Sequence, residues 1–207
     1  FNIQGYVQTL LDGGVEDKDI NYKYLERANK SVDRMINIVE DLEVISRLET
    51  EQSVLDIQKF NIVDLVKEVF EVMEMKASKM KIKFELINES QTNFVKGDKD
   101  KIQQVFINLI SNSIKYGKKG GKTTVRFFDM NSNMLIEVAD NGIGIKKQSL
   151  DRLFERFYRV DKNRSREIGG TGLGLAIVKH ILEGHNQQIN VRSTINVGST
   201  FSFILEK

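Results

Sequence analysis

The sequence predicts an α+β fold, a two-layer α/β sandwich preceded by an antiparallel helical hairpin. Two observations indicate this. A helical pattern runs from residue 24 to about residue 51 without a glycine, and strand-like and helix-like segments alternate from residue 53 onward. In that second region the helices form one group and the strands are mostly antiparallel, which is typical of helices packed on a sheet. We therefore expect two domains, at residues 1–52 and 53–207.

The long helical segment carries apolar residues at alternating steps of three and four, the spacing of a coiled-coil or bundle seam. These residues are Leu25, Ala28, Val32, Met35, Val39 and Leu42, followed by Ile45 and Leu48. A shorter helix precedes it, with Ile3, Val7, Leu10 and Leu11 on its apolar side and Gly13 and Gly14 at its end. Residues 15–20 are expected to form the acidic connector.

So long a seam on so short a partner helix leaves apolar surface uncovered. A homodimer with a four-helix bundle buries such a surface, and we expect this arrangement. The alternative is a helical pair that packs only on its own domain.

Beyond residue 53 the periodicity predicts the remaining elements. Strands are expected at residues 54–59, 82–87, 123–129, 134–139, 188–193 and 199–205. Helices are expected at residues 62–78, 98–116, 146–153 and 173–182.

Composition limits the possible functions. A net charge of +2 is too close to neutral to favour nucleic acid or an anionic membrane as the main partner. The absence of cysteine excludes disulfides, thiolate zinc sites and cysteine nucleophiles. No apolar run approaches the roughly 20 residues that a membrane span needs, and no signal peptide is visible. We expect a cytoplasmic location, with any membrane attachment in segments outside this chain.

Three polar segments indicate a nucleotide pocket. On the helix at residues 98–116, Asn108, Asn112 and Lys115 are separated by four and three residues and therefore share one face. Two amide oxygens beside a cation suit a Mg²⁺ ion that is held mainly by phosphates and water. For this helix taken alone, a solvated polar face is the favoured interpretation.

The second segment begins with Asp140, which ends an apolar strand and is followed by Asn-Gly-Ile-Gly. These residues form a tight turn, but a turn does not explain the carboxylate. A buried carboxylate needs a hydrogen-bond donor, and the amino group of adenine is one. A plain turn and a ligand site both fit this segment by itself.

The third segment is the glycine cluster at residues 169–175, which opens directly into an apolar helix. Free backbone N–H groups and the positive helix end favour phosphate there, whereas a flexible hinge is the alternative.

A basic loop precedes the cluster and could cover phosphates, with Arg159 the expected contact. Its cations are Arg156, Arg159, Lys162, Arg164 and Arg166, interleaved with Phe154, Phe157 and Tyr158. His180 and His185 are expected to be structural.

Taken in order, these segments resemble the motifs of sensor histidine kinases, in their catalytic ATP-binding domain of the Bergerat type. The N box resembles residues 108–116, the G1 box residues 140–145, the F box residues 154–157 and the G2 box residues 170–175. Residues 198–201, Gly-Ser-Thr-Phe, match the last glycine motif, and the helical hairpin resembles the dimerisation and histidine-phosphotransfer domain.

This resemblance implies ATP and Mg²⁺ as cofactors. It implies that Asp140 binds the adenine amino group with Thr200 nearby, and that Asn108 and Asn112 provide the Mg²⁺ site. Residues 156–170 would form a lid, and the glycines of the G2 box would cradle the phosphates. The implied nucleotide contacts are Asn108, Asn112, Lys115, Tyr116, Asp140, Gly142, Gly144, Ile145, Tyr158, Arg159, Gly170, Thr171, Gly172, Leu173, Gly174, Leu175 and Thr200.

One departure from the family changes the expected activity. Members carry the phosphoacceptor histidine in an H box just ahead of a segment like Phe1-Asn-Ile-Gln-Gly-Tyr, and this chain has no histidine there. We therefore expect binding of MgATP without self-phosphorylation. The γ-phosphoryl group would pass to an upstream histidine and then to an aspartate of a response-regulator receiver domain.

Three alternatives stay open. ATPases of the gyrase, mismatch-repair or chaperone type resemble one another in placing a glutamate where Asn108 stands, as a general base for water, and asparagine cannot accept that proton. Serine kinases of the anti-sigma type lack the long hairpin. A dimerisation module with a non-catalytic nucleotide pocket is the third alternative.

Overall fold

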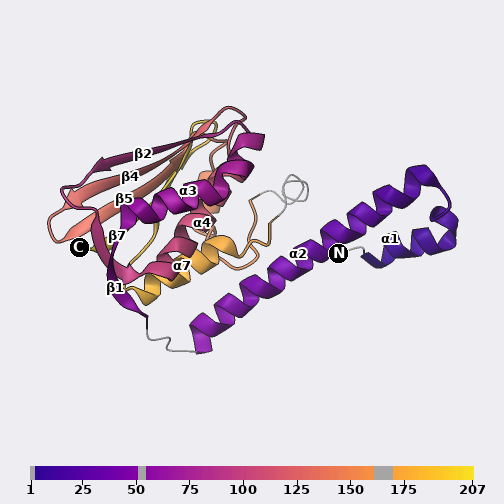
Figure 1. The fold of residues 1–207 in the computed structure, drawn as a ribbon, viewed down its shortest axis with the longest axis horizontal. Helices are drawn as coiled ribbons and strands as arrows, with labels where there is room; N and C mark the ends of the chain where they lie inside the picture. The colour runs from indigo at the N-terminus through magenta and orange to yellow at the C-terminus, as the bar shows by residue number, and fades with distance from the viewer. Residues whose placement is uncertain (1–2, 51–54, 161–169) are drawn as a thin grey trace.

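The computed structural model describes residues 3–50, 55–160 and 170–207. It consists of a helical hairpin, whose long second helix extends away as a rod, and an α/β domain (Figure 1). The expected division after residue 52 lies outside the described residues. Within the described ranges, no helix is both long and apolar enough to cross a membrane.

The hairpin consists of α1 (Ile3–Thr9), the π-helical turn η1 (Leu10–Gly14) and α2 (Lys18–Thr50). Gly13 has a φ of 105°, which reverses the chain at low cost because glycine has no Cβ. The expected connector at residues 15–20 is wrong in its second half, since α2 begins at Lys18. The reason is the side chain of Asp17, which accepts a hydrogen bond from the backbone N–H of Asp19 at 2.9 Å, as a helix N-cap does.

Aromatic contacts hold the two helices of the hairpin together. The rings of Tyr6 and Tyr24 meet edge to face, with centroids 5.7 Å apart, and the guanidinium of Arg27 on α2 lies 6.0 Å from the centroid of the Tyr6 ring on α1. The predicted seam of α2 is solvent-exposed in the single chain. Its exposed apolar residues are Leu25, Val32, Met35, Val39 and Leu42. The side chains of Ile45 and Leu48 are outside the described part of the structure.

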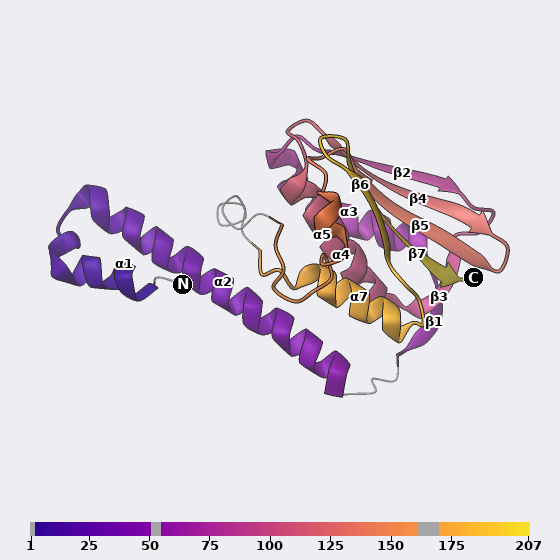
Figure 2. The ribbon, with the colours of Figure 1, turned by 180° about the vertical axis from the view of Figure 1, so that it is seen from behind.

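The α/β domain is a two-layer sandwich, which confirms the predicted fold class. Its five-stranded sheet has the order β2-β4-β5-β7-β6, and only the pair β2–β4 is parallel. The strands are β2 (Lys83–Glu89), β4 (Lys122–Met130), β5 (Asn133–Asp140), β6 (Asn190–Thr194) and β7 (Gly198–Glu206). Helices α3 (Ile62–Lys79), α4 (Lys99–Tyr116) and α7 (Gly174–Gly184) cover one face of this sheet (Figures 1 and 2).

A separate antiparallel ribbon pairs β1 (Ile57–Asn61) with β3 (Phe94–Asp98). The sequence did not predict β3, because it is only five residues long and contains Gly97, a residue that strands disfavour. The short helix α5 (Lys147–Leu150) is also briefer than the predicted one.

The helix α4 is central to the core and is fixed at its start. Phe106 and Ile110 are fully buried, and the Phe106 ring packs against Phe203 of β7 at 5.9 Å between centroids. The side chain of Asp98 caps the helix by accepting a hydrogen bond from the Lys101 N–H at 3.1 Å. The polar residues of α4 are therefore held at a defined height and rotation relative to the sheet.

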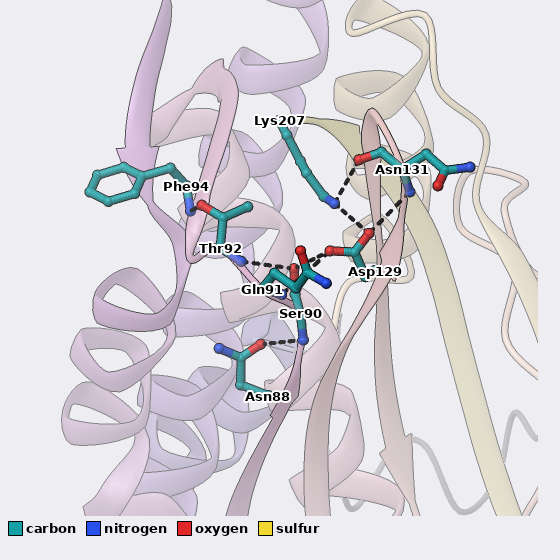
Figure 3. A network of polar contacts seen from close by, with 8 residues as sticks. All are labelled: Asn88, Ser90, Gln91, Thr92, Phe94, Asp129, Asn131 and Lys207. Atoms are coloured by element: carbon teal, nitrogen blue, oxygen red, sulfur yellow. Dashed lines mark hydrogen bonds and ion pairs between the residues drawn. The ribbon is translucent and has the colours of Figure 1, made fainter.

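A polar network closes the end of the sheet where β4 turns into β5 (Figure 3). Lys207 donates to the Asp129 carboxylate at 2.6 Å and to the Asn131 carbonyl at 2.7 Å. The backbone N–H of Gln91 also donates to Asp129, at 3.4 Å. The hydrogen bond from Lys207 is the main cause that lowers the pKa of Asp129. This network lies at the opposite end of β5 from Asp140.

Candidate nucleotide-binding site

The three polar segments that the sequence singled out meet at one cavity of about 1050 Å³. Helix α4 lines one side of it, the turn after β5 and the β6–β7 turn form the floor, and the glycine segment before α7 forms another side. Its size is in the range that small-molecule ligands occupy. The predicted site residues that line it are Asn108, Asn112, Lys115, Tyr116, Asp140, Gly144, Ile145, Tyr158, Arg159, Gly170, Thr171, Gly172, Gly174 and Leu175.

Asp140 provides a buried carboxylate at the floor of this cavity. Its Oδ1 accepts the backbone N–H of Gly142 at 2.8 Å, and the carboxylate also accepts the backbone N–H of Ser199. Burial raises the pKa of Asp140, and these two hydrogen bonds oppose the rise only in part. The carboxylate therefore keeps unused acceptor capacity that faces the cavity.

The turn after Asp140 fits only because position 142 is glycine. A Cβ on Gly142 would collide with the carbonyl oxygen of Tyr116 and would lie 2.7 Å from Asp140 Oδ1. The backbone N–H of Ile143 donates to that same Tyr116 carbonyl at 3.1 Å. The turn is thus attached to the C-terminal end of α4, and the G1 and N segments form one rigid wall.

The β6–β7 turn holds the other side of the same segment. The hydroxyl of Ser193 accepts the backbone N–H of Ile145 at 2.8 Å and donates to the carbonyl of Gly198 at 2.9 Å. The backbone N–H of Asn196 donates to the Ile143 carbonyl at 2.8 Å. These bonds fix the floor of the cavity from a part of the chain about 50 residues away in sequence.

The glycine segment before α7 lies directly against α4. A Cβ built on Gly174 would lie 3.0 Å from Asn108 Oδ1, and one built on Gly170 would lie 3.8 Å from Lys115 Nζ. Asn108 and Lys115 of α4 therefore face the backbone of the glycine segment. Phosphate oxygens between the two would meet a cation on one side and backbone N–H groups on the other.

Cations gather at this end of the cavity. Burial lowers the pKa of Lys115, and the positive charges of Lys76 and Arg159 lower it further, against an opposing effect of Asp41. Burial lowers the pKa of Arg159 as well, together with the charge of Arg34. Cations held this close repel one another, so a bound polyanion would be stabilised there.

The donor set fits a magnesium ion that is carried by a nucleotide. Asn108 and Asn112 present amide oxygens on one face of α4, and such hard oxygen ligands suit Mg²⁺. The described residues contain no group of three or more His, Cys, Asp or Glu that could hold a metal by protein ligands alone. The remaining ligands would be phosphate oxygens and water.

Three of the predicted site residues do not line the cavity. Gly142 and the fully buried Leu173 lie behind its wall. The third is Thr200: Ser199 pairs with Asp140 across β5 and β7, so Thr200, one residue further, points to the opposite face of the sheet. Ser199 lines the cavity instead.

Several lining residues were not foreseen from the sequence. Those from α2 and α3 are Lys30, Asp33, Arg34, Asn37, Asp41 and Lys76. The predicted lid cations Lys162, Arg164 and Arg166 lie outside the described residues. His185 has a structural environment, as expected: Nδ1 lies 2.7 Å from the Ile181 carbonyl, and Nε2 accepts the Asp98 N–H at 3.0 Å.

Comparison with known proteins identifies families that match this chain. The profile of the histidine kinase-, DNA gyrase B- and HSP90-like ATPases matches residues 97–207, and that of the His Kinase A (phospho-acceptor) domain matches residues 2–51. The sensor histidine kinase WalK of Bacillus subtilis is 35% identical over 98% of this chain and 33% of its own length. The drug sensory protein A of Synechocystis sp. is 35% identical over 99% of this chain and 32% of its own length.

Solved structures agree with these relatives. The histidine kinase AdeS of Acinetobacter baumannii has a TM-score of 0.79 at 27% identity, covering 99% of this chain and 92% of that one. The histidine kinase ThkA in complex with the response regulator protein TrrA has a TM-score of 0.75 at 25% identity, covering 100% of this chain and 59% of that one.

The fold and the matched residues define residues 97–207 as an ATP-binding domain of the ATPase and kinase class. With the phospho-acceptor match at residues 2–51, the chain belongs to the histidine kinase-, DNA gyrase B- and HSP90-like ATPase family and, within it, to the sensor histidine kinases of two-component systems. It spans about one third of the length of the curated relatives that it matches.

Two aspartates, Asp140 at the end of β5 and Asp129 on β4 beside the start of β5, should affect stability with opposite signs. Because burial raises the pKa of Asp140, its ionised form costs folding free energy at neutral pH. This cost decreases as the pH falls below the folded-state pKa and is gone below the unfolded-state pKa. The nucleotide-free Asp140→Asn variant should therefore unfold at an equal or higher temperature than the wild type at pH 7, with a smaller difference in acid.

Asp129→Asn is the matched control. The pKa of Asp129 is lowered, so its carboxylate stabilises the fold above its unfolded-state pKa, and the stabilisation is lost in acid. This variant should melt below the wild type at pH 7, with a gap that closes at low pH. Thermal unfolding followed by circular dichroism checks both, and a lower midpoint for Asp140→Asn at pH 7 would contradict the electrostatic argument.

Proposed function

We propose that this chain binds MgATP in the cavity and positions its γ-phosphoryl group for transfer to a histidine outside these 207 residues. From there the phosphoryl group passes to an aspartate of a response-regulator receiver domain. One observation carries the proposal: the Asp140 carboxylate and the Asn108 and Lys115 side chains line a single cavity, on either side of the space that a nucleotide needs.

Each end of the cavity suits a different part of ATP. The Asp140 carboxylate accepts a hydrogen bond from the adenine amino group, with Ser199 rather than Thr200 as its neighbour. Lys115 and the backbone of the glycine segment hold the phosphates, and Arg159 adds a second cation. Asn108 and Asn112 would hold a Mg²⁺ ion, which would supply positive charge against the phosphates.

The residue at position 108 favours transfer over hydrolysis. An asparagine amide cannot take a proton from water, so the site has no general base where the related ATPases carry glutamate. Catalysis then consists of positioning and charge stabilisation of the phosphoryl group. The phospho-acceptor match at residues 2–51 supports this choice over the gyrase-type alternative.

We expect the histidine that receives phosphate to lie outside this chain, because the region that matches the phospho-acceptor domain has none. Residues 2–51 contain no histidine, and both ring nitrogens of His185 are within hydrogen-bond distance of the protein backbone.

The histidine kinase ThkA forms a complex with the response regulator protein TrrA, which supports a receiver domain as partner here. The exposed seam of α2 and the phospho-acceptor match support a homodimer through the hairpin. We propose a cytoplasmic location, where ATP is available, and any membrane anchor in other segments.

The Asp140→Asn variant tests the adenine contact. It loses a hydrogen bond to a charged acceptor, a loss of about 1.5–3 kcal/mol, so Kd for a non-hydrolysable ATP analogue with Mg²⁺ should rise about ten- to a hundredfold. Asp129→Asn makes the same change on β4, beside the far end of β5, and should bind like the wild type. Isothermal titration calorimetry measures both, and unchanged affinity in Asp140→Asn, or no binding by the wild type at millimolar analogue, would refute the assignment.

Incubation with ATP labelled at the γ-phosphate tests the missing acceptor. We expect no acid-labile phosphate on the chain, because the region that matches the phospho-acceptor domain contains no histidine. Label on His180 or His185 would overturn this part of the proposal. Steady ATP hydrolysis at ordinary enzymatic rates would favour the gyrase-type alternative instead.

A further inference from the structure

Helix α2 of the hairpin supplies a carboxylate to the wall of the nucleotide cavity. Asp41 lies on the face of α2 that lines the cavity, and its Oδ2 accepts a hydrogen bond from the Thr171 hydroxyl at 2.5 Å. The two residues are 130 positions apart in sequence. Helices α2 and α7 are in contact there, so this bond joins the hairpin to the glycine segment of the catalytic domain.

The carboxylate lies at the end of the cavity where phosphate is expected. Thr171 follows Gly170, whose backbone lies close to the Lys115 ammonium group, and its hydroxyl accepts the backbone N–H of Leu173 at 3.2 Å at the start of α7. The negative charge of Asp41 acts on Lys115 and raises its pKa against the other influences. A cation, a hydroxyl and a helix start are the groups that an anionic phosphate would use.

We propose that Asp41 takes the place of a nucleotide phosphate in the nucleotide-free protein and competes with the triphosphate for the glycine segment. The inference rests on the function proposed above. The Thr171 hydroxyl has one hydrogen to donate, so it cannot serve Asp41 and a phosphate oxygen together. The like charges of a carboxylate and a triphosphate also repel each other across this short distance.

Competition couples nucleotide binding to the position of the hairpin. If ATP weakens the contact between α2 and the glycine segment, that contact weakens ATP binding by the same factor. Loading with ATP therefore releases the catalytic domain from α2, whereas adenosine, which has no phosphate, leaves the contact in place. The opposite role for Asp41 would be to support phosphate binding. If Asp41 held Thr171 in a conformation that favours phosphate, removing the carboxylate would weaken ATP binding.

Calorimetry with two ligands separates these roles. In Asp41→Asn, Kd for the non-hydrolysable ATP analogue with Mg²⁺ should fall at least about fivefold, while Kd for adenosine stays the same. Glu40→Gln is the matched control, because Glu40 is an exposed neighbour on α2 that does not line the cavity, and it should change neither value by more than about twofold.

The other outcomes decide against the inference. An unchanged or higher Kd for the ATP analogue in Asp41→Asn overturns it, and so does an equal gain for adenosine and the analogue. A wild-type protein that binds neither ligand refutes the proposed function itself, which distinguishes the two failures.

A distance measurement tests the release without altering Asp41. The chain has no cysteine, so spin labels can be placed at Lys23→Cys on α2 and Glu71→Cys on α3, both of which are exposed. The ATP analogue with Mg²⁺ should broaden or lengthen the distance distribution between the labels, and adenosine should not. A distribution that saturating analogue leaves unchanged would overturn the inference.

Discussion

The structure depends on the position of one buried carboxylate, Asp140, at the end of the central strand β5. Two backbone N–H groups hold it, and the close contact of Gly142 with the end of α4 fixes its height above the sheet. A buried charge with partial compensation is a cost to folding, and a carboxylate with a perturbed pKa in a cavity is typical of a functional site. Backbone hydrogen bonds join the C-terminal end of α4, the turn after Asp140 and the β6–β7 turn around this carboxylate.

The phosphate end of the cavity is organised by charge rather than by packing. Burial lowers the pKa of Lys115, and the charges of Lys76 and Arg159 lower it further. This cluster of cations is therefore electrostatically unfavourable by itself, and a bound polyanion relieves it. Asp41 supplies part of that negative charge from the hairpin. The same electrostatic need can therefore be met by a nucleotide or by α2, which links the chemistry of the site to the arrangement of the two parts of the chain.

Much of the fold and of the cavity lining followed from local sequence. Helices α3 and α4 have strong apolar periodicity, and the glycine motifs occur at turns where their spacing has a direct physical reason. Thr200 was predicted to be near Asp140, but Ser199 lines the cavity, because consecutive side chains of a strand point to opposite faces of the sheet. The role of Asp41 could not be predicted, since a contact over 130 residues leaves no periodic or compositional signal on α2.

Hydrogen–deuterium exchange of the intact chain, with and without a non-hydrolysable ATP analogue and Mg²⁺, tests the central claim most directly. Nucleotide bound between Asp140 and the glycine segment should slow exchange at residues 108–116, 140–145 and 170–175 together. The ribbon of β1 and β3 and the network around Asp129, which lie away from the cavity, should exchange at the same rate in both states. Protection confined to the far end of the sheet, or none in the three segments, would contradict the account.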